Sequence, residues 1–392
     1  MLKRLCNIFL GIVLLSSAAN AAEQSRAAEL ARLKAEKAKK LHPYVPNKAE
    51  QIIPRLTGPR KGLYPYFGSA FSGGGLALGP GYLWLFGDTG SLDILGAWSI
   101  ENYRKAEANL RLPGFGSRYL TTEVNTKYVN AGHLSFFGLG NDTTLDDEST
   151  FAYRPFSVGL IETFALSKFV SVGGGVEYLH VDTGPSNQSP SIEQIYTPAT
   201  APGLGTDPDY TNLSVFGAFD WRQFPGYTTK GGYYRVDWKD YNEHDSGQFS
   251  FRRLDIELDQ YIPILRANQI IALRALASFA YAGEDEIVPF FLMPKLGGSK
   301  ELRGFRGFRF RDRNRILLTA EYRWTPSKML DLAIFYERGK VEPFAEDLDF
   351  KNLQYSWGVG ARFHGPNLTF LRIEVGVSKE ATRLILDTGL VF

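Results

Sequence analysis

Side chains able to carry out catalysis are sparse in this chain of 392 residues. Covalent catalysis needs a nucleophile with a general base beside it, and histidine is the commonest such base. The five histidines, none of which lies in a recognisable nucleophile motif, are His42, His133, His180, His244 and His364. The only cysteine is Cys6. The sequence therefore predicts a protein that is not an enzyme and that uses no cofactor and no metal ion.

Charged residues gather in two places where they could bind a ligand. The first is an acidic cluster, which could hold a divalent cation or bridge to lipopolysaccharide through one. The alternative is that these acids simply lie in a solvated outer loop. The cluster consists of Asp142, Asp146, Asp147 and Glu148. Residues 303–311 hold only Arg, Gly and Phe, a composition that can stack on bases and neutralise phosphates. This run is short and single, and the net charge of +2 creates no strong field, so we expect no nucleic-acid partner.

The strand that follows this run places charge and apolar bulk on opposite faces. Glu321 and Arg323 are interleaved with Ala320, Tyr322 and Trp324, and successive side chains of a strand point to opposite sides. The same alternation recurs in three further segments, 253–259, 354–363 and 371–378. A barrel with lipid outside and a polar lumen inside requires this pattern. The 28 Phe, 20 Tyr and 6 Trp suit its aromatic girdles, and the 40 Gly suit its tight turns.

Segments of period two predict sixteen strands, and hence an all-β fold: a 16-stranded antiparallel transmembrane β-barrel. Their spans are 74–86, 90–102, 104–113, 118–129, 131–138, 151–164, 168–181, 210–222, 228–240, 249–263, 268–282, 315–325, 329–338, 353–363, 367–378 and 382–392. The connections divide by length, as they do in barrels with short periplasmic turns and longer outer loops. The short ones are Asn130, 166–168, 325–328 and 364–367, and the long ones are 141–150, 182–209, 283–314 and 339–352.

Residues 1–21 are predicted to be a secretory signal peptide. Lys3 and Arg4 supply a positive start, 8–15 supply an apolar stretch, and small residues allow cleavage after Ala21. The mature chain would then contain no cysteine. The remaining sequence has no apolar run of about 18 residues, so no transmembrane helix is expected.

Residues 22–62 are predicted as a periplasmic segment and 63–392 as the barrel. The stretch 22–40 is rich in Ala, Glu and Lys and favours helix, and a proline-rich linker follows it. The helix would bury little apolar surface, so we expect it to be solvated. Insertion into the pore or pairing with a partner is the alternative.

The chain ends on an alternating segment with a terminal aromatic residue. The residues predicted to share one face of this segment are Leu384, Leu386, Thr388, Leu390 and Phe392. This ending resembles the closing strand of bacterial outer-membrane barrels, where it serves as a recognition signal for insertion. Leu390 and Phe392 are therefore predicted to carry that signal. Together with the signal peptide, the ending indicates the bacterial outer membrane.

A glycine-punctuated motif lies within and after the connection 283–314. It consists of Gly297-Gly298, then Arg303-Gly304-Phe305, then Glu321-Tyr322-Arg323 on the next strand, with FFGLGNDT at 136–143 as a second recurring segment. These residues resemble the bacterial surface antigen barrel of the BamA/TamA outer-membrane assembly superfamily, over roughly residues 65 to 392. The resemblance implies sixteen strands and a loop, between the eleventh and twelfth, that folds back into the lumen.

The resemblance also implies partners for the loop arginine. It is expected to reach acids on the twelfth and thirteenth strands, and the matching positions are Glu321 and Glu337. A guanidinium in a narrow lumen favours bidentate carboxylate partners. The spacing from the glycine pair favours Arg303 as this arginine, and Arg306, in a second Arg-Gly-Phe, is the alternative. Gly304 would then permit a tight backbone bend, and the phenylalanine after it would wedge against the wall.

The predicted function is outer-membrane biogenesis, through insertion or translocation of proteins or of lipids. The mechanism would use the lumen loop and a weak seam between the first and last strands. The glycines at 73–75 would loosen the pairing of the first strand with the last, and a simple bend at the barrel seam explains them equally well. Predicted partners are outer-membrane lipid or lipopolysaccharide and client outer-membrane proteins. A separate protein with polypeptide-transport-associated (POTRA) domains is a further expected partner, because residues 22–62 are too few for one. The alternative is a passive channel or surface structural barrel without the assembly role.

Overall fold

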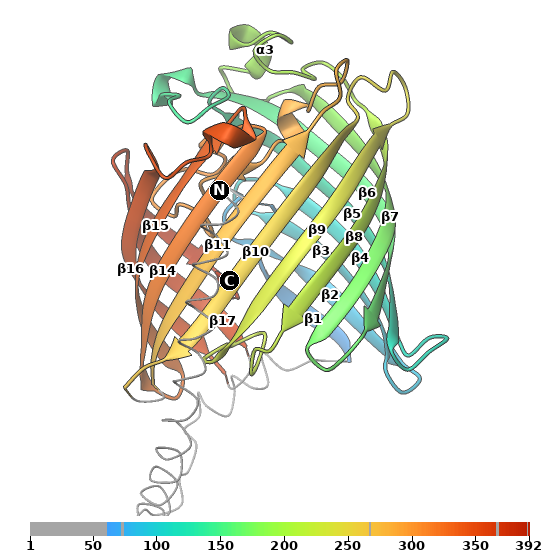
Figure 1. The fold of residues 1–392 in the computed structure, drawn as a ribbon, viewed down its shortest axis with the longest axis vertical. Coiled ribbons are helices and arrows are strands. Elements are labelled where there is room, and N and C mark those ends of the chain that lie inside the picture. The colour runs from blue at the N-terminus through green and yellow to red at the C-terminus, as the bar shows by residue number, and fades with distance from the viewer. Residues whose placement is uncertain (1–60, 72–73, 266–267, 366–367, 390) are drawn as a thin grey trace, which may run out of the picture. The chain divides into compact units, whose positions relative to one another are not determined.

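The structure is a computed structural model that describes residues 61–71, 74–265, 268–365, 368–389 and 391–392. The predicted signal peptide and the predicted helix at 22–40 lie outside these residues. Sixteen strands form a single antiparallel sheet in which each strand pairs with its neighbours in the sequence of barrel strands. Figure 1 shows these strands tilted around a barrel, with the longer connections and α3 (Ile192–Ile195) gathered at one end. The predicted all-β, 16-stranded fold is confirmed.

The strands have the following bounds. The first eight are β1 (Gly62–Gly68), β2 (Ala77–Phe86), β3 (Gly90–Ser99), β4 (Arg104–Pro113), β5 (Leu120–Phe136), β6 (Ser149–Ala165), β7 (Val170–Pro185) and β8 (Asp209–Asp220). The second eight are β9 (Gly231–Glu243), β10 (Phe251–Pro263), β11 (Gln269–Tyr281), β14 (Asn314–Ser327), β15 (Leu330–Glu342), β16 (Gln354–His364), β17 (Thr369–Val377) and β18 (Thr382–Asp387). A separate pair, β12 (Lys295–Leu296) and β13 (Phe310–Arg311), lies in the connection between β11 and β14.

Helical structure among the described residues is confined to the connections. Besides α3, the short turns of 3-10 helix are η1 (Leu145–Asp147), η2 (Phe290–Leu292) and η3 (Ala345–Asp347). None of the helices in the described ranges is long and apolar enough to cross a bilayer.

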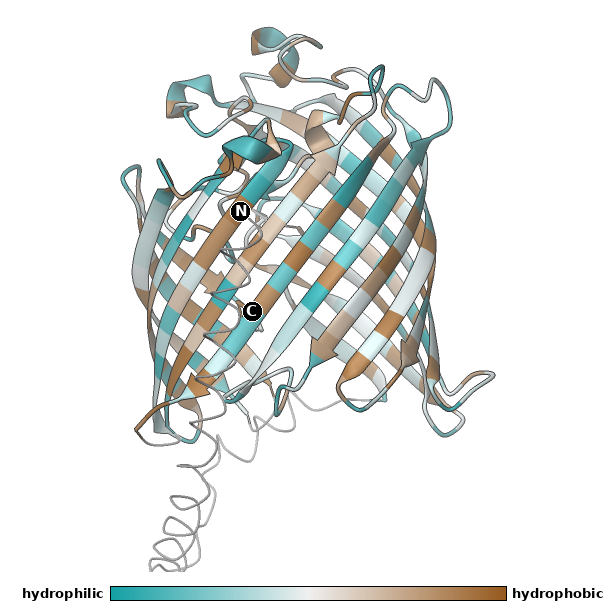
Figure 2. Cartoon of the chain, viewed as in Figure 1, coloured by the Kyte–Doolittle hydropathy of each residue, from teal (hydrophilic) through white to brown (hydrophobic). Residues whose placement is uncertain are grey.

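The barrel wall has an apolar outside and a polar inside. On β15, Leu332, Ile334 and Tyr336 are exposed, whereas the alternating Asp331 and Glu337 are buried. Apolar residues recur along the strands of the wall seen in Figure 2. Large apolar side chains that face outwards on strand after strand require a hydrocarbon surrounding, because monomeric soluble proteins rarely expose large apolar patches.

The predicted number of strands is right, although one strand was missed and another was counted as two. The first strand is β1, at residues where the sequence predicted no strand, since the first predicted strand was 74–86. The predicted strands 118–129 and 131–138 are one strand, β5, and Asn130 lies inside it. A register shift between Ala131 and Leu134 breaks the alternation there. From β6 onwards the strand order agrees, so the long connection 282–313 lies between the eleventh and twelfth strands of the barrel.

The two ends of the sheet do not meet in a hydrogen-bonded ladder. In the described parts of the chain, β1 pairs with β2 and β18 with β17, and no pairing joins β1 to β18. Pro65 of β1 stands opposite Pro80 of β2, and proline has no N–H, so neither residue can donate a ladder hydrogen bond. Gly74 and Gly75 lie in the connection between β1 and β2. The prediction that they loosen the first strand from within is therefore wrong.

The C-terminal residues leave the wall and turn inwards. β18 ends at Asp387, and Gly389 has a φ of 73° that redirects the chain. Val391 and Phe392 are buried against residues of β10 and β11, namely Tyr261, Ile270 and Ala272. The prediction that Phe392 shares one strand face with Leu384 is therefore wrong. Leu390 lies outside the described residues, and the role of both residues as an insertion signal stays a prediction.

Candidate functional site

The connection 282–313, called the inner loop below, folds back against inward-facing side chains of the wall. Its two ends are held together by β12 and β13, in which Leu296 faces Phe310. Gly297 and Gly298 follow β12 with φ values of 105° and 135°, a region that residues with side chains rarely adopt. A Cβ at Gly297 would also lie 2.2 Å from the carbonyl oxygen of Arg306. Only glycine allows the chain to turn here.

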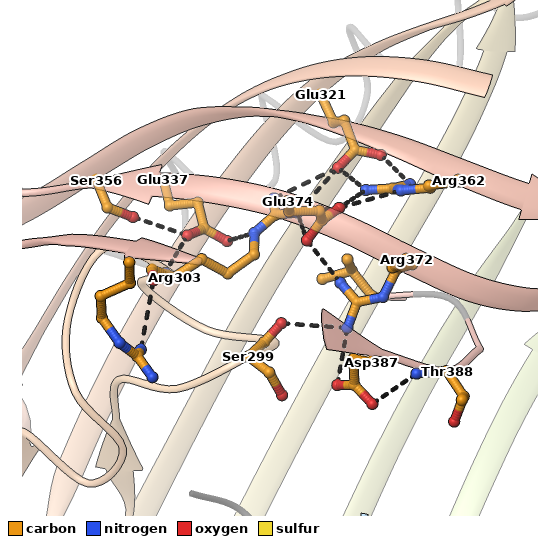
Figure 3. A network of polar contacts seen from close by, with 12 residues as sticks. Ser299, Arg303, Glu321, Glu337, Ser356, Arg362, Arg372, Glu374, Asp387 and Thr388 are labelled. Atoms are coloured by element: carbon orange, nitrogen blue, oxygen red, sulfur yellow. Dashed lines mark hydrogen bonds and ion pairs between the residues drawn. The ribbon is translucent and has the colours of Figure 1, made fainter. Parts of the chain in front are cut away.

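Arg303 is the centre of a buried ionic cluster, shown in Figure 3. Its backbone N–H donates to Glu337 Oε2 at 2.6 Å, and its Nε donates to Glu337 Oε1 at 3.0 Å. Its terminal nitrogens donate to Glu321 Oε2 at 3.3 Å and to the two oxygens of Glu374 at 3.1 and 3.2 Å. The guanidinium carbon lies 3.4 Å from the ring centroid of Phe335. Arg303 therefore contacts acids on β14, β15 and β17 at once.

Three wall arginines share these acids. Arg362 donates to Glu321 at 2.5 and 2.6 Å and to Glu374 at 2.7 Å. Arg323 donates to Glu321 at 2.5 Å. Arg372 donates to Glu374 at 2.8 Å and to Asp387 of β18 at 2.9 Å. The hydroxyl of Ser356 on β16 donates to Glu337 at 2.8 Å.

The cluster is buried and balanced in charge. Four guanidiniums (Arg303, Arg323, Arg362, Arg372) face four carboxylates (Glu321, Glu337, Glu374, Asp387), and each residue is at most 8% exposed. Burial alone would lower the pKa of Arg303, but Glu337, Glu374 and Glu321 outweigh it and the pKa is raised. An unpaired buried charge costs several kcal/mol, roughly 3–5 when one partner is removed. Glu337, whose ion-pair partner is Arg303, is therefore compensated only when the inner loop is docked.

The residues that follow Arg303 make apolar and close backbone contacts. Phe305 is fully buried in a cluster with Leu276, Leu317 and Val341 of the wall. A Cβ on Gly304 would lie 2.6 Å from the backbone of Val377 on β17. We expected Gly304 to serve a tight bend. The structure shows that it serves close approach of two backbones, since a side chain there has no space.

The second Arg-Gly-Phe has a different partner. Arg306 is half exposed and pairs with Glu148 at 2.5 Å, so Arg303 rather than Arg306 reaches the wall acids. Arg309 donates to Glu380 at 2.8 Å and to the hydroxyl of Thr143 at 2.7 Å. The backbone of Arg311 bridges to Gly140. The segment 136–143 noticed in the sequence thus contacts the inner loop through Thr143 and Gly140.

The inner loop also contacts β18 and the turn before it, at the edge of the sheet. Arg383 of β18 donates to the carbonyl oxygens of Arg303 and Phe305. Ser378 donates to the carbonyl oxygen of Gly304 at 2.9 Å, and Arg309 reaches Glu380 in the turn before β18. Movement of the inner loop therefore breaks contacts with the strand that would close the barrel against β1.

A second connection enters the lumen from the opposite end. Residues 221–230 join β8 to β9, and the Tyr227 hydroxyl donates to Asp331 at 3.1 Å. The Tyr227 ring stacks on His364 with centroids 3.8 Å apart, and the carbonyl oxygen of Thr228 accepts from Arg323 at 3.4 Å. This connection therefore reaches inward-facing residues of β14, β15 and β16.

The remaining predicted features are placed as follows. In the acidic cluster, Asp147 caps η1 by accepting from Thr144, and Glu148 pairs with Arg306. Within the described ranges, no group of three or more acids, histidines or cysteines is arranged to hold a metal ion. Sequence reasoning missed Arg362, Arg372 and Glu374 as members of the cluster. Their positions on the polar faces of two strands were the available signal, but strand register was needed to place them level with Arg303.

Comparison with known proteins identifies the barrel. Residues 89–384 match the Omp85 superfamily domain. The chain belongs to the Omp85 superfamily. The resemblance inferred from the motif is thereby confirmed, and this Omp85 barrel is a protein of the bacterial outer membrane. A search of curated proteins gives no significant match.

Solved structures share the fold of this Omp85 barrel at low sequence identity. The crystal structure of BamA from Haemophilus ducreyi lacking POTRA domains 1–3 is 14% identical, with a TM-score of 0.61 over 84% of this chain and 70% of that one. CdiB from Escherichia coli is 13% identical, with a TM-score of 0.57 over 84% of this chain and 62% of that one. CdiB from Acinetobacter baumannii is 14% identical, with a TM-score of 0.50 over 83% and 58%.

Proposed function

We propose that this barrel acts in outer-membrane biogenesis by inserting or translocating client proteins. The observation that carries the proposal is the joint contact of the inner loop with the buried cluster and with β18. Insertion through a wall requires a place where the wall opens. The unpaired edges of β1 and β18 supply that place, and the inner loop is tied to one of them.

The proposed mechanism is an exchange of contacts at the seam. With the inner loop docked, Arg383 of β18 donates to the carbonyl oxygen of Arg303, while Asp387 of β18 accepts from Arg372 of the neighbouring β17. A client strand would pair with the free edge of β1 or β18, because an unpaired edge is a template for β-strand addition. Release of the inner loop would free β18 to move. No covalent chemistry is involved in this exchange.

The obstruction of the lumen weighs against a passive channel. Near one end the inner loop packs Arg303 and Phe305 against inward-facing side chains of the wall, and at the other end Tyr227 contacts Asp331. We take these segments to obstruct the lumen. A channel for solutes needs a continuous wet path. The proposal therefore takes the lumen segments as gates, and takes client proteins rather than small solutes as cargo.

Two partners follow from this proposal. Client outer-membrane proteins would be the cargo, and a separate protein with POTRA domains would deliver them. Lipids are a second possible cargo, since the same seam opens towards the bilayer. Depletion of the protein in its host discriminates among these.

The decisive experiment is quantification of outer-membrane proteins after depletion. We expect the abundance of other barrels in the outer membrane to fall, and expression of wild-type protein to restore it. Re-expression of Arg303→Ala should restore it only in part. Unchanged barrels with altered lipid asymmetry would transfer the role to lipids. Unchanged barrels with altered solute uptake would contradict the proposal and favour a passive channel.

A further inference from the structure

A polar cavity opens on the outer surface of the barrel, away from the inner loop. Its volume is about 200 Å³, and its lining includes Arg104, Arg154, Asn102, Asn130 and Asn187. His133, Gly132 and Pro185 complete the lining, and no acidic residue belongs to it. Two guanidiniums and three amides around one cavity form a set of hydrogen-bond donors suited to an anion.

Strand register places this cavity on the outward face of the wall. Arg104 of β4 stands opposite Asn130 of β5, and Arg154 of β6 stands opposite Asp182 of β7. Two residues further from the rim, the outward positions are Tyr128 and Phe156, which stand opposite each other. Arg104, Asn130 and Arg154 thus form a polar row nearer the rim, and Tyr128 and Phe156 form an aromatic row next to it.

The aromatic row marks the edge of the apolar band. Tyr128 is 39% exposed and Phe156 37% exposed, and Val158 and Leu160 continue outward-facing apolar surface along β6. Aromatic girdles lie at the two membrane interfaces of such barrels. The polar row lies beyond this girdle, on the side of the long connections, which are extracellular in such barrels. The cavity is therefore level with the headgroups of the outer leaflet.

The arginines in the cavity retain unused donors. Arg104 lies over the Trp98 ring with its guanidinium carbon 4.5 Å from the centroid, and the described residues contain no ion-pair partner for it. Asn102 accepts from Trp98 Nε1 at 2.7 Å, which leaves its amide nitrogen free to donate. Arg154 uses one terminal nitrogen, Nη1, for Asp182 at 3.0 and 3.2 Å. Its remaining N–H groups can therefore bind a ligand.

We propose that this cavity binds the phosphorylated headgroup of an outer-leaflet glycolipid. The phosphate would accept from Arg104 and Arg154, and the sugar hydroxyls and carbonyls would pair with the amides of Asn102, Asn130 and Asn187. The acyl chains would then lie along Tyr128 and Phe156. Arginine suits this role because its planar fork matches phosphate oxygens in pairs. The site would anchor the barrel wall in the leaflet on the β4–β7 side.

The test measures binding of defined lipids to the purified, detergent-solubilised protein by native mass spectrometry. Four probes separate the possible ligands: bisphosphorylated lipid A, the same lipid without phosphates, phosphatidylglycerol and inorganic phosphate. We expect lipid A to bind and the other three to bind at least tenfold more weakly. Since a charge-assisted hydrogen bond contributes about tenfold in affinity or more, Arg104→Ala/Arg154→Ala should lose at least tenfold.

A matched control is Arg252→Ala. Arg252 is an exposed arginine near one end of β10, opposite Asp240, and it does not line the cavity. It should leave lipid A binding unchanged, and heat-modifiable migration on gels should show that all variants fold. Arg104→Lys/Arg154→Lys should retain part of the affinity, because charge remains and the fork is lost.

Five outcomes would overturn the proposal, and the first three concern the variants and the phosphates of lipid A. They are unchanged lipid A binding by the double alanine variant, equal loss in Arg252→Ala, and equal binding of dephosphorylated lipid A. Equal binding of phosphatidylglycerol would show a general lipid-phosphate site, and equal binding of inorganic phosphate a free-anion site. Either result would also reject a glycolipid site. None of these outcomes bears on client insertion, so this test and the depletion test fail separately.

Discussion

Replacement of Arg303 by alanine should undock the inner loop. Glu321 would keep Arg323 and Arg362, and Glu374 would keep Arg362 and Arg372. In the docked state Glu337 would keep the backbone N–H of residue 303 and the hydroxyl of Ser356, but it would lose its guanidinium partner and so become an uncompensated buried charge. Breaking a buried pair in this way costs about 3–5 kcal/mol. The docked state should therefore lose roughly 10²- to 4 × 10³-fold in population relative to the undocked state.

Planar-bilayer conductance reads out this change. The wild type should show small, steady conductance, because the inner loop occupies the lumen. Arg303→Ala should show larger and unstable conductance, because the loop leaves the lumen more often. Arg306→Ala is the matched control, since Arg306 is three residues away and makes one half-exposed pair with Glu148. A surface pair contributes about 0–1 kcal/mol, so this variant should resemble the wild type.

A second substitution separates loss of the arginine from the orphaned acid. Glu337→Gln in the Arg303→Ala background removes the uncompensated charge, so conductance should return part of the way towards that of the wild type. Identical traces for the wild type and Arg303→Ala would refute the buried-clamp reasoning. Equal effects of Arg303→Ala and Arg306→Ala would refute it as well, since burial would then not matter.

Four further substitutions or treatments test other parts of the structure. Gly304→Ala forces a Cβ against the backbone of Val377, and overpacking of this kind costs about 1–3 kcal/mol of folding free energy. The variant should therefore unfold at a lower temperature than the wild type, and an unchanged unfolding temperature in detergent would contradict the close approach. Tyr227→Ala removes the lumen contacts of residues 221–230, so conductance should rise, whereas the exposed Tyr119→Ala should have no effect. Boiling should slow migration on gels, since closed barrels resist unfolding in detergent, and removal of Phe392 should reduce the fraction that migrates fast when unheated.

The sequence predicted the wall well because alternation is a local property of each strand. It failed where local pattern and structure diverge. β1 was missed because Pro65 resembles the prolines of the preceding linker, although an edge strand tolerates proline. β5 was divided because its bulge at Ala131 breaks the period of two. The inward turn after Asp387 was missed because Leu384 to Phe392 keeps the alternation of a strand.

The sequence motif was enough to predict part of the site. Arg303, Glu321 and Glu337 were identified from the motif and from strand order. Arg362 and Glu374 were not identified, because parity shows which face a side chain occupies and does not show its height in the barrel. Height depends on the register of every strand between, which the sequence does not display. The inward course of 221–230 depends on contacts across the lumen and was likewise hidden.

Assisted insertion in liposomes tests the central claim most directly. Purified barrel is reconstituted, an unfolded outer-membrane protein is added, and its folding is followed by heat-modifiable migration over time. Wild-type liposomes should fold the client faster than empty liposomes, and Arg303→Ala liposomes should differ in rate from the wild type while Arg306→Ala liposomes do not. Client folding at the rate of empty liposomes, even with a POTRA-containing partner supplied, would contradict the account.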